Sequence, residues 1–120
     1  MKDMPLEIAN FFLAMQAGRA GADRLAACFA EDAVYDEPFT GEMRRHEGRD
    51  AVMAAMAMGW ENPMPDMHIR VDHVSTDGNE IELDWTCFSP ALPGGSGSGH
   101  NSYVMKDGLI MSLVTTMKEG

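Results

Sequence analysis

The sequence predicts an α+β fold in which three N-terminal helices pack on one face of a curved, mixed but mostly antiparallel sheet. Three observations lead to this prediction. Apolar residues recur at helical spacing in the first half of the chain and alternate with polar residues in the second half. The helical stretches precede most of the strand stretches, an order typical of α+β folds. The 120 residues, of which 45% are apolar, suit one compact domain over 1–120.

The first half of the chain carries the helix signals. Asp3 and Pro5 are suited to a helix start, and Gly18 and Gly21 to its end. Between them the apolar residues at helical spacing are Ile8, Phe11, Phe12 and Met15. A short second helix is expected over 22–30. A third begins near Asp50 and has an apolar stripe of Val52, Met53, Met56 and Trp60, and its end is marked by Gly59, Pro63 and Pro65.

A strand over 33–37 separates the second helix from the third, and 39–48 reads as a polar loop. Asp36 and Glu37 are neighbours on this strand, so they face opposite sides of the sheet. Pro38 restricts the residue before it to extended geometry. Glu37 is therefore expected at the rigid end of a strand. His46 lies in the predicted loop and is expected to be solvated.

The second half of the chain reads as an antiparallel meander of four strands. Alternation of apolar and polar residues begins at Met67, turns at 76–79 and continues to Cys87. Two further strands are expected over 100–106 and 109–117, joined by an Asp-Gly turn. Residues 90–99 are rich in Gly and Ser, so we expect a mobile loop that is dispensable for folding.

Charge and hydropathy exclude several kinds of partner. The formal net charge is −10, and the 9 Lys and Arg residues form no basic stripe, which argues against nucleic acid. No apolar run approaches the about 20 residues that span a bilayer, so no membrane partner is expected. No signal peptide is visible, and this predicts a cytoplasmic protein.

Three segments carry a resemblance to known proteins: FAEDAVYDEPF at 29–39, EGRDAV at 47–52 and DGLI at 107–110. In this order they resemble the cone-shaped, cystatin-like roll that nuclear transport factor 2 shares with SnoaL-type polyketide cyclases, scytalone dehydratase and ketosteroid isomerases. The central stretch is most similar to ketosteroid isomerase-like proteins. Proteins of this fold often pair through the open face of the sheet, so the resemblance also implies a homodimer.

The resemblance implies a set of site residues. The general base of ketosteroid isomerases precedes a Pro-Phe-type dipeptide, and Glu37 occupies that position here. A tyrosine on the first helix and a protonated aspartate on a late strand form their oxyanion hole. The tyrosine position falls on Phe11, which has no hydroxyl, and the aspartate position falls on Asn101, or on His100 if the turn differs in length by one residue.

The residues around Glu37 suggest how it would behave as a base. Val34, Tyr35 and Phe39 are apolar or aromatic, so an inward carboxylate would be partly desolvated and its pKa raised towards neutral pH. Asp84 alternates with the apolar residues of its strand and is expected to face outward. A shift of register by one residue would instead make it a second acid in the pocket.

These features predict a small-molecule enzyme without cofactor or metal, an isomerase or a cyclase- or dehydratase-like lyase. Glu37 would remove a proton next to a carbonyl, and Asn101 or His100 would hold the developing negative charge. The ligand is expected to be a small, mostly apolar organic molecule. The predicted pocket residues are Phe11, Met15, Tyr35, Met56, Trp60, Trp85, Thr115 and Met117. The alternative is a non-catalytic ligand-binding or dimerisation domain, which the phenylalanine at position 11 favours.

Overall fold

The computed structural model describes residues 5–39, 41–61 and 66–118, without the side chains of 59–61. The elements follow in the order α1 (Leu6–Gln16), η1 (Gly18–Gly21), α2 (Ala22–Ala26), β1 (Phe29–Glu37), β2 (Arg44–Glu47), α3 (Arg49–Glu61), β3 (His68–Asp77), β4 (Glu80–Phe88), η2 (Pro93–Gly95), β5 (Ser96–Lys106) and β6 (Leu109–Met117). Helices therefore precede most of the sheet, as the sequence predicts.

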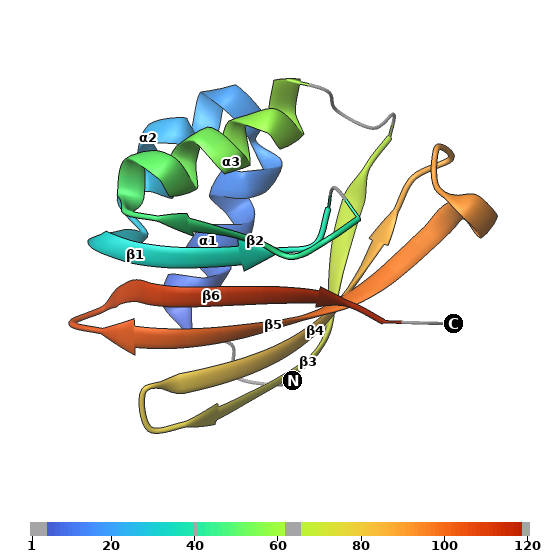
Figure 1. Cartoon of the computed structure of the whole chain (residues 1–120). Helices are drawn as coiled ribbons and strands as arrows, with labels where there is room; N and C mark the ends of the chain where they lie inside the picture. Colours follow the sequence, from blue (N-terminus) through green and yellow to red (C-terminus); the bar gives the residue numbers. More distant parts are fainter. Residues whose placement is uncertain (1–4, 40, 62–65, 119–120) are drawn as a thin grey trace.

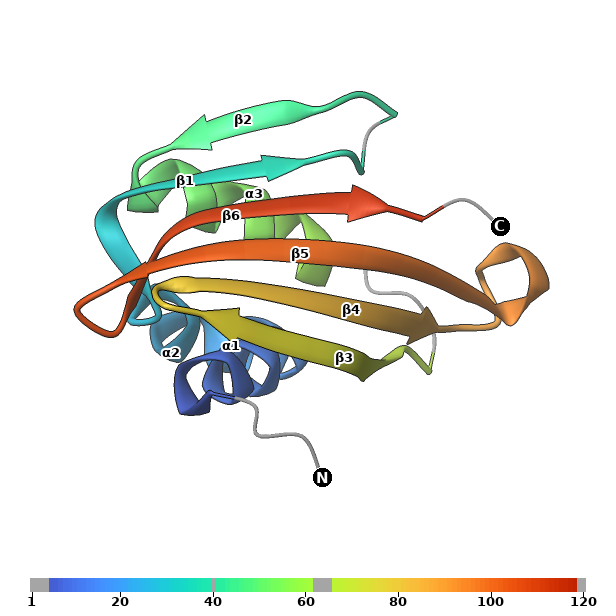
Figure 2. The ribbon, with the colours of Figure 1, turned by 90° about the horizontal axis from the view of Figure 1, so that it is seen from below.

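Within these residues, six strands form one sheet in the order β2-β1-β6-β5-β4-β3. The β1–β6 pair is parallel and the remaining neighbours are antiparallel. The three helices cover one face of the curved sheet, and the other face is left open (Figures 1 and 2). The predicted fold, three helices on a mixed and mostly antiparallel sheet, is confirmed.

The core lies between the helices and the covered face of the sheet. Phe11 of α1 is 1% exposed, and its ring meets those of Phe12, Phe29 and Tyr103 edge-on at centroid distances of 5.1, 6.0 and 5.7 Å. Burial of each such ring contributes about 1.5–3 kcal/mol to stability. These contacts anchor α1 against two strands, β1 and β5, that lie on either side of β6.

The segment 39–48 differs from its predicted conformation as a loop. Residues Arg44–Glu47 form β2, which pairs antiparallel with the end of β1. In that register Arg44 lies opposite Glu37 and His46 lies opposite Tyr35. A short polar edge strand shows no alternation of apolar and polar residues, so the sequence pattern does not predict it. The neighbouring β1 also begins earlier than expected, at Phe29, so α2 is shorter.

The expectation of a loop over 90–99 is wrong for its last four residues. Ser96–Lys106 forms the whole of β5, and Gly97 and Gly99 are paired with Cys87 and Trp85 of β4. The turn proper is η2, where Gly94 and Gly95 have positive φ angles of 70° and 85°. Glycine is favoured in that region because it has no Cβ to clash with the backbone.

In the part of the chain that the structure describes, no helix has the length and apolar character needed to cross a membrane.

Candidate active site

Three buried polar side chains lie in a row across the covered face of the sheet. Asp36 is paired with Val114, so the next residue, Glu37, lies beside Thr115, which is itself paired with Asn101. Their exposed fractions are 2%, 4% and 5%. Neighbouring strands are about 4.8 Å apart, so the Glu37 and Asn101 backbones are separated by about 10 Å. This row forms the polar strip of an otherwise apolar interior.

The Glu37 carboxylate accepts hydrogen bonds at both oxygens. Arg44 donates from Nε and Nη2 to Oε2, at 2.9 and 2.7 Å, and the His46 Nε2 lies 2.9 Å from the same oxygen. The backbone N–H of Phe39 donates to Oε1 at 2.7 Å. Because β1 ends at Glu37 and β2 returns beside it, the hairpin itself assembles this cluster.

The expectation that desolvation raises the pKa of Glu37 is wrong. Burial alone would raise it, but the hydrogen bonds from His46, Phe39 and Arg44 together outweigh burial and lower the pKa. These donors, and the positive charge of Arg44, all favour the ionised form. Glu37 is therefore an ionised carboxylate with little tendency to take up a proton near neutral pH.

The sequence predicts that His46 is solvated in a loop, and this is wrong. His46 lies on β2 and contacts the Glu37 carboxylate. Its side chain is 18% exposed, and its ring lies 5.8 Å from the Tyr35 ring. A carboxylate oxygen only accepts, so Nε2 carries the hydrogen of this bond. In the neutral ring Nδ1 then bears the lone pair.

Asn101 lies at the centre of a second cluster, made of neutral groups. Its Oδ1 accepts from Trp85 Nε1 and Thr115 Oγ1, both at 2.9 Å, and its Nδ2 donates to the Tyr103 hydroxyl oxygen at 2.9 Å. Thr115 also hydrogen-bonds Tyr35. Burial raises the pKa of both tyrosines, so their hydroxyls stay protonated. The cluster presents hydroxyl and amide hydrogens in a buried setting.

His100 lies on the opposite, open face of the sheet. Its Nδ1 is 2.7 Å from Asp84 and its Nε2 is 2.6 Å from Glu82. Asp84 also pairs with Lys118 at 2.9 Å, so it faces outward, as its alternation indicates. Of the two residues left open as the holder of negative charge, the structure brings only Asn101 to the same face as Glu37.

Most predicted pocket residues line the same interior. Five are buried, Met15 is half-buried and Met117 is 46% exposed at the end of β6. The buried five are Phe11, Tyr35, Met56, Trp85 and Thr115. Trp60 belongs to α3, but its side chain lies outside the part that the structure describes.

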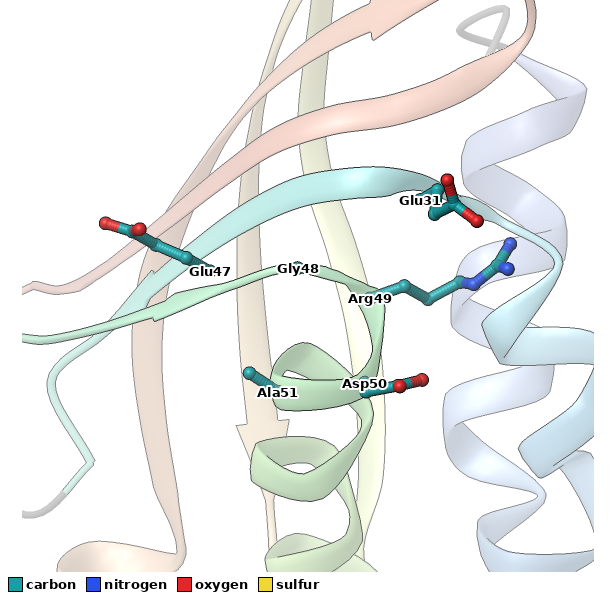
Figure 3. A pocket seen from close by; sticks show the side chains of 6 residues that line it. All are labelled: Glu31, Glu47, Gly48, Arg49, Asp50 and Ala51. Atoms are coloured by element: carbon teal, nitrogen blue, oxygen red, sulfur yellow. The ribbon is translucent and has the colours of Figure 1, made fainter.

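A surface hollow of about 370 Å³ lies at the start of α3 and is separate from these clusters. It is lined by Glu31, Glu47, Gly48, Arg49, Asp50 and Ala51, and Figure 3 shows the Arg49 side chain extending towards Glu31. No predicted site residue is among them. Within the described residues, no group of three or more His, Cys, Asp or Glu side chains is arranged to bind a metal.

The sequence reasoning missed Arg44, His46 and Tyr103. The first two alternate at positions i and i+2 just after a turn, which places them on one face if the segment is a strand. If that strand pairs antiparallel with β1, the Arg44 and His46 side chains both lie on the same face as Glu37. Tyr103 follows Asn101 by two residues on the same strand, so an inward Asn101 implies an inward Tyr103.

Comparison with solved structures agrees with this architecture. A protein from Sinorhizobium meliloti, provisionally named a polyketide cyclase, is 23% identical with a TM-score of 0.79, covering 95% of this chain and 96% of that one. A protein from Kribbella flavida, provisionally named a ketosteroid isomerase, is 20% identical with a TM-score of 0.75, covering 95% and 76%. An NTF2-like protein of unknown function from Cytophaga hutchinsonii is 16% identical with a TM-score of 0.70, covering 98% and 95%. At these identities the likeness is one of fold.

Among curated proteins, no sequence matches the chain. A protein-family model described as a SnoaL-like domain does match, over residues 8–113, which includes β1, β2 and β5 and the residues of both polar clusters except Thr115. Since that match spans most of the chain, the protein belongs to the SnoaL-like domain family.

Proposed function

We propose that the chain is a cofactor-free small-molecule enzyme that moves a proton next to a carbonyl group. The observation that carries the proposal is the contact between His46 Nε2 and the buried, ionised Glu37. A carboxylate that fixes the tautomer of a histidine and stabilises its charged form is a recurrent arrangement in general-base catalysis. Placed on an apolar interior, the pair suits a mostly apolar ketone or enone.

His46 is the base in this proposal, and Glu37 positions it. His46 Nδ1 takes a proton from the carbon next to the carbonyl, which leaves an imidazolium and an enolate. The imidazolium would form beside the Glu37 carboxylate, which the hydrogen bonds from His46, Phe39 and Arg44 keep ionised. When the ketone also carries a C=C bond next to the carbon that loses the proton, the enolate is a dienolate, and return of the same proton to its far (γ) carbon moves the double bond and completes an isomerisation with no net gain or loss of atoms.

Asn101 supports the other half of the reaction. Its amide nitrogen can donate to the enolate oxygen without itself changing charge, as the donors of an oxyanion hole do. The backbones of Asn101 and Glu37 lie about 10 Å apart across two strand spacings, so the proposal requires a ligand that extends from one polar cluster to the other.

The second candidate is a non-catalytic domain that binds a small apolar ligand. Phe11 favours it, because this residue cannot donate a hydrogen bond from α1. The binding candidate needs only the apolar interior, and it predicts that the bound molecule is released chemically unchanged.

A ligand screen followed by product analysis separates the two candidates. The purified protein is screened by thermal shift against cyclic ketones, enones and aromatic polyketide-like compounds, and every stabilising compound is incubated and analysed by mass spectrometry and NMR. The enzyme proposal predicts an isomerised, cyclised or dehydrated product from at least one compound. Stabilising ketones that are all recovered unchanged and with unexchanged protons would contradict it and favour the binding domain.

A further inference from the structure

His100 lies on the open face of the sheet with a carboxylate at each of its ring nitrogens. Its Nδ1 is 2.7 Å from Asp84, and its Nε2 is 2.6 Å from Glu82. An ionised carboxylate only accepts hydrogen bonds, so each of these short contacts needs a hydrogen on the ring nitrogen. A neutral ring carries one such hydrogen, whereas the imidazolium carries two. The geometry around His100 therefore fits the imidazolium.

Two further side chains hold the carboxylates in their ionised form. Ser102 Oγ donates to Glu82 at 2.6 Å, and this bond lowers the pKa of Glu82. Lys118 Nζ lies 2.9 Å from Asp84, and hydrogen bonds from His100 and Lys118 lower the pKa of Asp84. We call the ionisable groups Glu82, Asp84, His100 and Lys118 the His100 cluster. Its negative and positive charges balance when His100 is an imidazolium, and one negative charge is in excess when His100 is neutral.

The rest of the open face is acidic. Acids outnumber bases among the described residues that the strand pairings place on this face. Arg45 and Arg70 are each paired with an aspartate there. His73 on β3 is opposite Asp84 and so lies beside the His100 cluster. The acids around the cluster are Asp36, Glu47, Asp72, Asp77 and Glu80. A positive charge on His100 therefore offsets part of a negative surface.

The size of the open face suits a second copy of the chain. The helices pack on the other face, and His100 is on β5, between β6 and β4 (Figure 2). Six strands span five spacings of about 4.8 Å, and strands of 9–11 residues rise about 3.3 Å per residue, so the face measures about 24 by 30 Å. Its area of about 700 Å² is close to the about 800 Å² that each partner buries in a standard interface.

We propose that the open face binds a second copy of this chain while His100 is an imidazolium, and that loss of the His100 proton separates the two copies. The partner is a copy that presents the same face, and the proton is the ligand that controls their association. The inference is independent of the proposed proton transfer, which is assigned to residues of the covered face.

Association takes the His100 cluster out of water, so its charge balance contributes to the free energy of association. Removing one partner of a buried ion pair is strongly unfavourable, because the other charge is left uncompensated. A neutral His100 has one ring hydrogen, so either Glu82 or Asp84 would face a nitrogen lone pair. The excess negative charge would also lie against the same excess on the second copy, and like charges across an interface repel.

The surroundings of His100 give the direction of the pH dependence. Burial alone would lower its pKa, but the hydrogen bonds and charges of Asp84 and Glu82 outweigh burial and raise the pKa above the ordinary value of about 6.5. Association is therefore expected to be strongest below about pH 6.5 and to weaken as pH rises through the raised pKa.

Sedimentation velocity at several protein concentrations gives the dissociation constant of the pair at about pH 6 and about pH 9, on either side of the histidine range. For the wild type this constant is expected to be about 5–150-fold larger at the higher pH, the usual size of coupling between two binding events. His100→Arg keeps a cation with several donors, so it should associate at both pH values. His100→Gln is neutral and should associate weakly at both. His73→Gln, opposite the same Asp84, is the matched control and should keep the wild-type pH dependence.

A second measurement uses the wild-type protein. If a proton strengthens association, then association must raise the proton affinity of His100 by the same factor. The ring signals of His100 in ¹H–¹³C NMR spectra are identified by their absence from His100→Gln and are titrated with pH at protein concentrations below and above the dissociation constant. The midpoint of the titration is expected at a higher pH in the associated protein.

The outcomes either support or overturn the inference. A monomeric wild type at about pH 6, an equal dissociation constant at both pH values, or a His100 midpoint that is independent of protein concentration would each overturn it. So would wild-type pH dependence in a folded His100→Gln, or its loss in His73→Gln. Association that depends on pH through His100, in a protein that exchanges no ketone protons, would support this inference and contradict the proposed function alone.

Discussion

His100 is the residue of the open face whose charge is most closely tied to its neighbours. Both ring nitrogens contact carboxylates, Asp84 and Glu82, and Lys118 pairs with the same Asp84. Burial alone would lower the pKa of His100, but the hydrogen bonds and charges of these two carboxylates outweigh it and raise the pKa. An imidazole ring with a carboxylate at each nitrogen is stable as the imidazolium, because the imidazolium donates a hydrogen bond from both nitrogens.

The raised pKa predicts the direction of a pH effect on stability. Because the folded pKa lies above that of the unfolded chain, this contribution is fully present below about pH 6.5, the ordinary histidine pKa, and is lost as pH rises through the folded pKa. Thermal unfolding followed by circular dichroism should give a wild-type Tm that falls across this range, and His100→Gln should flatten the fall. Thr116→Ala, which removes the exposed, non-titrating residue paired with His100, is the control and should keep the wild-type slope. Identical slopes in the wild type and His100→Gln would contradict the assignment.

At the scale of single residues, the sequence predicts which positions face inward better than what those residues do there. Alternation along the strands puts Glu37 on one face, Asp36 on the other, and Asp84 outward. The pKa of Glu37 could not be predicted, because the Arg44 and His46 that lower it come from a strand without an apolar pattern. The sequence likewise left Asn101 and His100 as alternatives, since only the β4–β5 register fixes their faces.

The β4–β5 connection shows how strand boundaries depend on partners. Backbone bonds run from Ser89 N to Gly95 O and from Lys118 N to Ser98 O, so residues on both sides of the turn are held. Residues 96–99 lack strand-type side chains, and they form a strand because they pair with β4. Gly99 has no Cβ, and this leaves space for the Trp85 ring that lies against it. Propensity alone cannot supply that information.

Two shortened variants test this boundary. Replacing residues 90–95 with a tight Asn-Gly turn removes only the turn, so the variant is expected to fold with a Tm close to that of the wild type. Replacing 90–99 also removes the partners of Trp85 and Cys87 in the sheet, and it is expected to lower the Tm strongly or prevent folding. Equal thermal stability of the two variants, measured by calorimetry, would show that 96–99 is not an integral part of β5.

At the scale of the whole molecule, the sequence predicted the layer arrangement because helical and alternating periods are properties of whole segments. It predicted the covered face from the same periods, and the resemblance added the curvature. These periods do not predict the edge strand β2 or residues 96–99 at the start of β5, because each of these segments is a strand only through its pairing with a neighbouring strand. Both polar clusters of the proposed site border these two segments.

The open face of the sheet remains the predicted surface for a homodimer. Val114 lies on this face of β6, a strand near the middle of the sheet. Light scattering at micromolar concentration is expected to give the mass of two chains, and Val114→Glu is expected to give one, because it introduces like charges at a symmetric contact. Ala54→Glu, on an exposed position of α3, is the control and should remain dimeric. A monomeric wild type would contradict the prediction.

The central claim, proton transfer by a His46–Glu37 pair, is tested most directly by hydrogen–deuterium exchange. Ketones and enones that stabilise the protein are incubated with it in D₂O, and loss of the signals from protons next to the carbonyl is followed by ¹H NMR. We expect catalysed exchange with the wild type, a fall of about 10²–10⁴-fold in Glu37→Gln and His46→Gln, and no fall in Asp36→Asn, whose carboxylate lies on the other face. Exchange at the full wild-type rate in both Glu37→Gln and His46→Gln, with the proteins folded, would contradict the account.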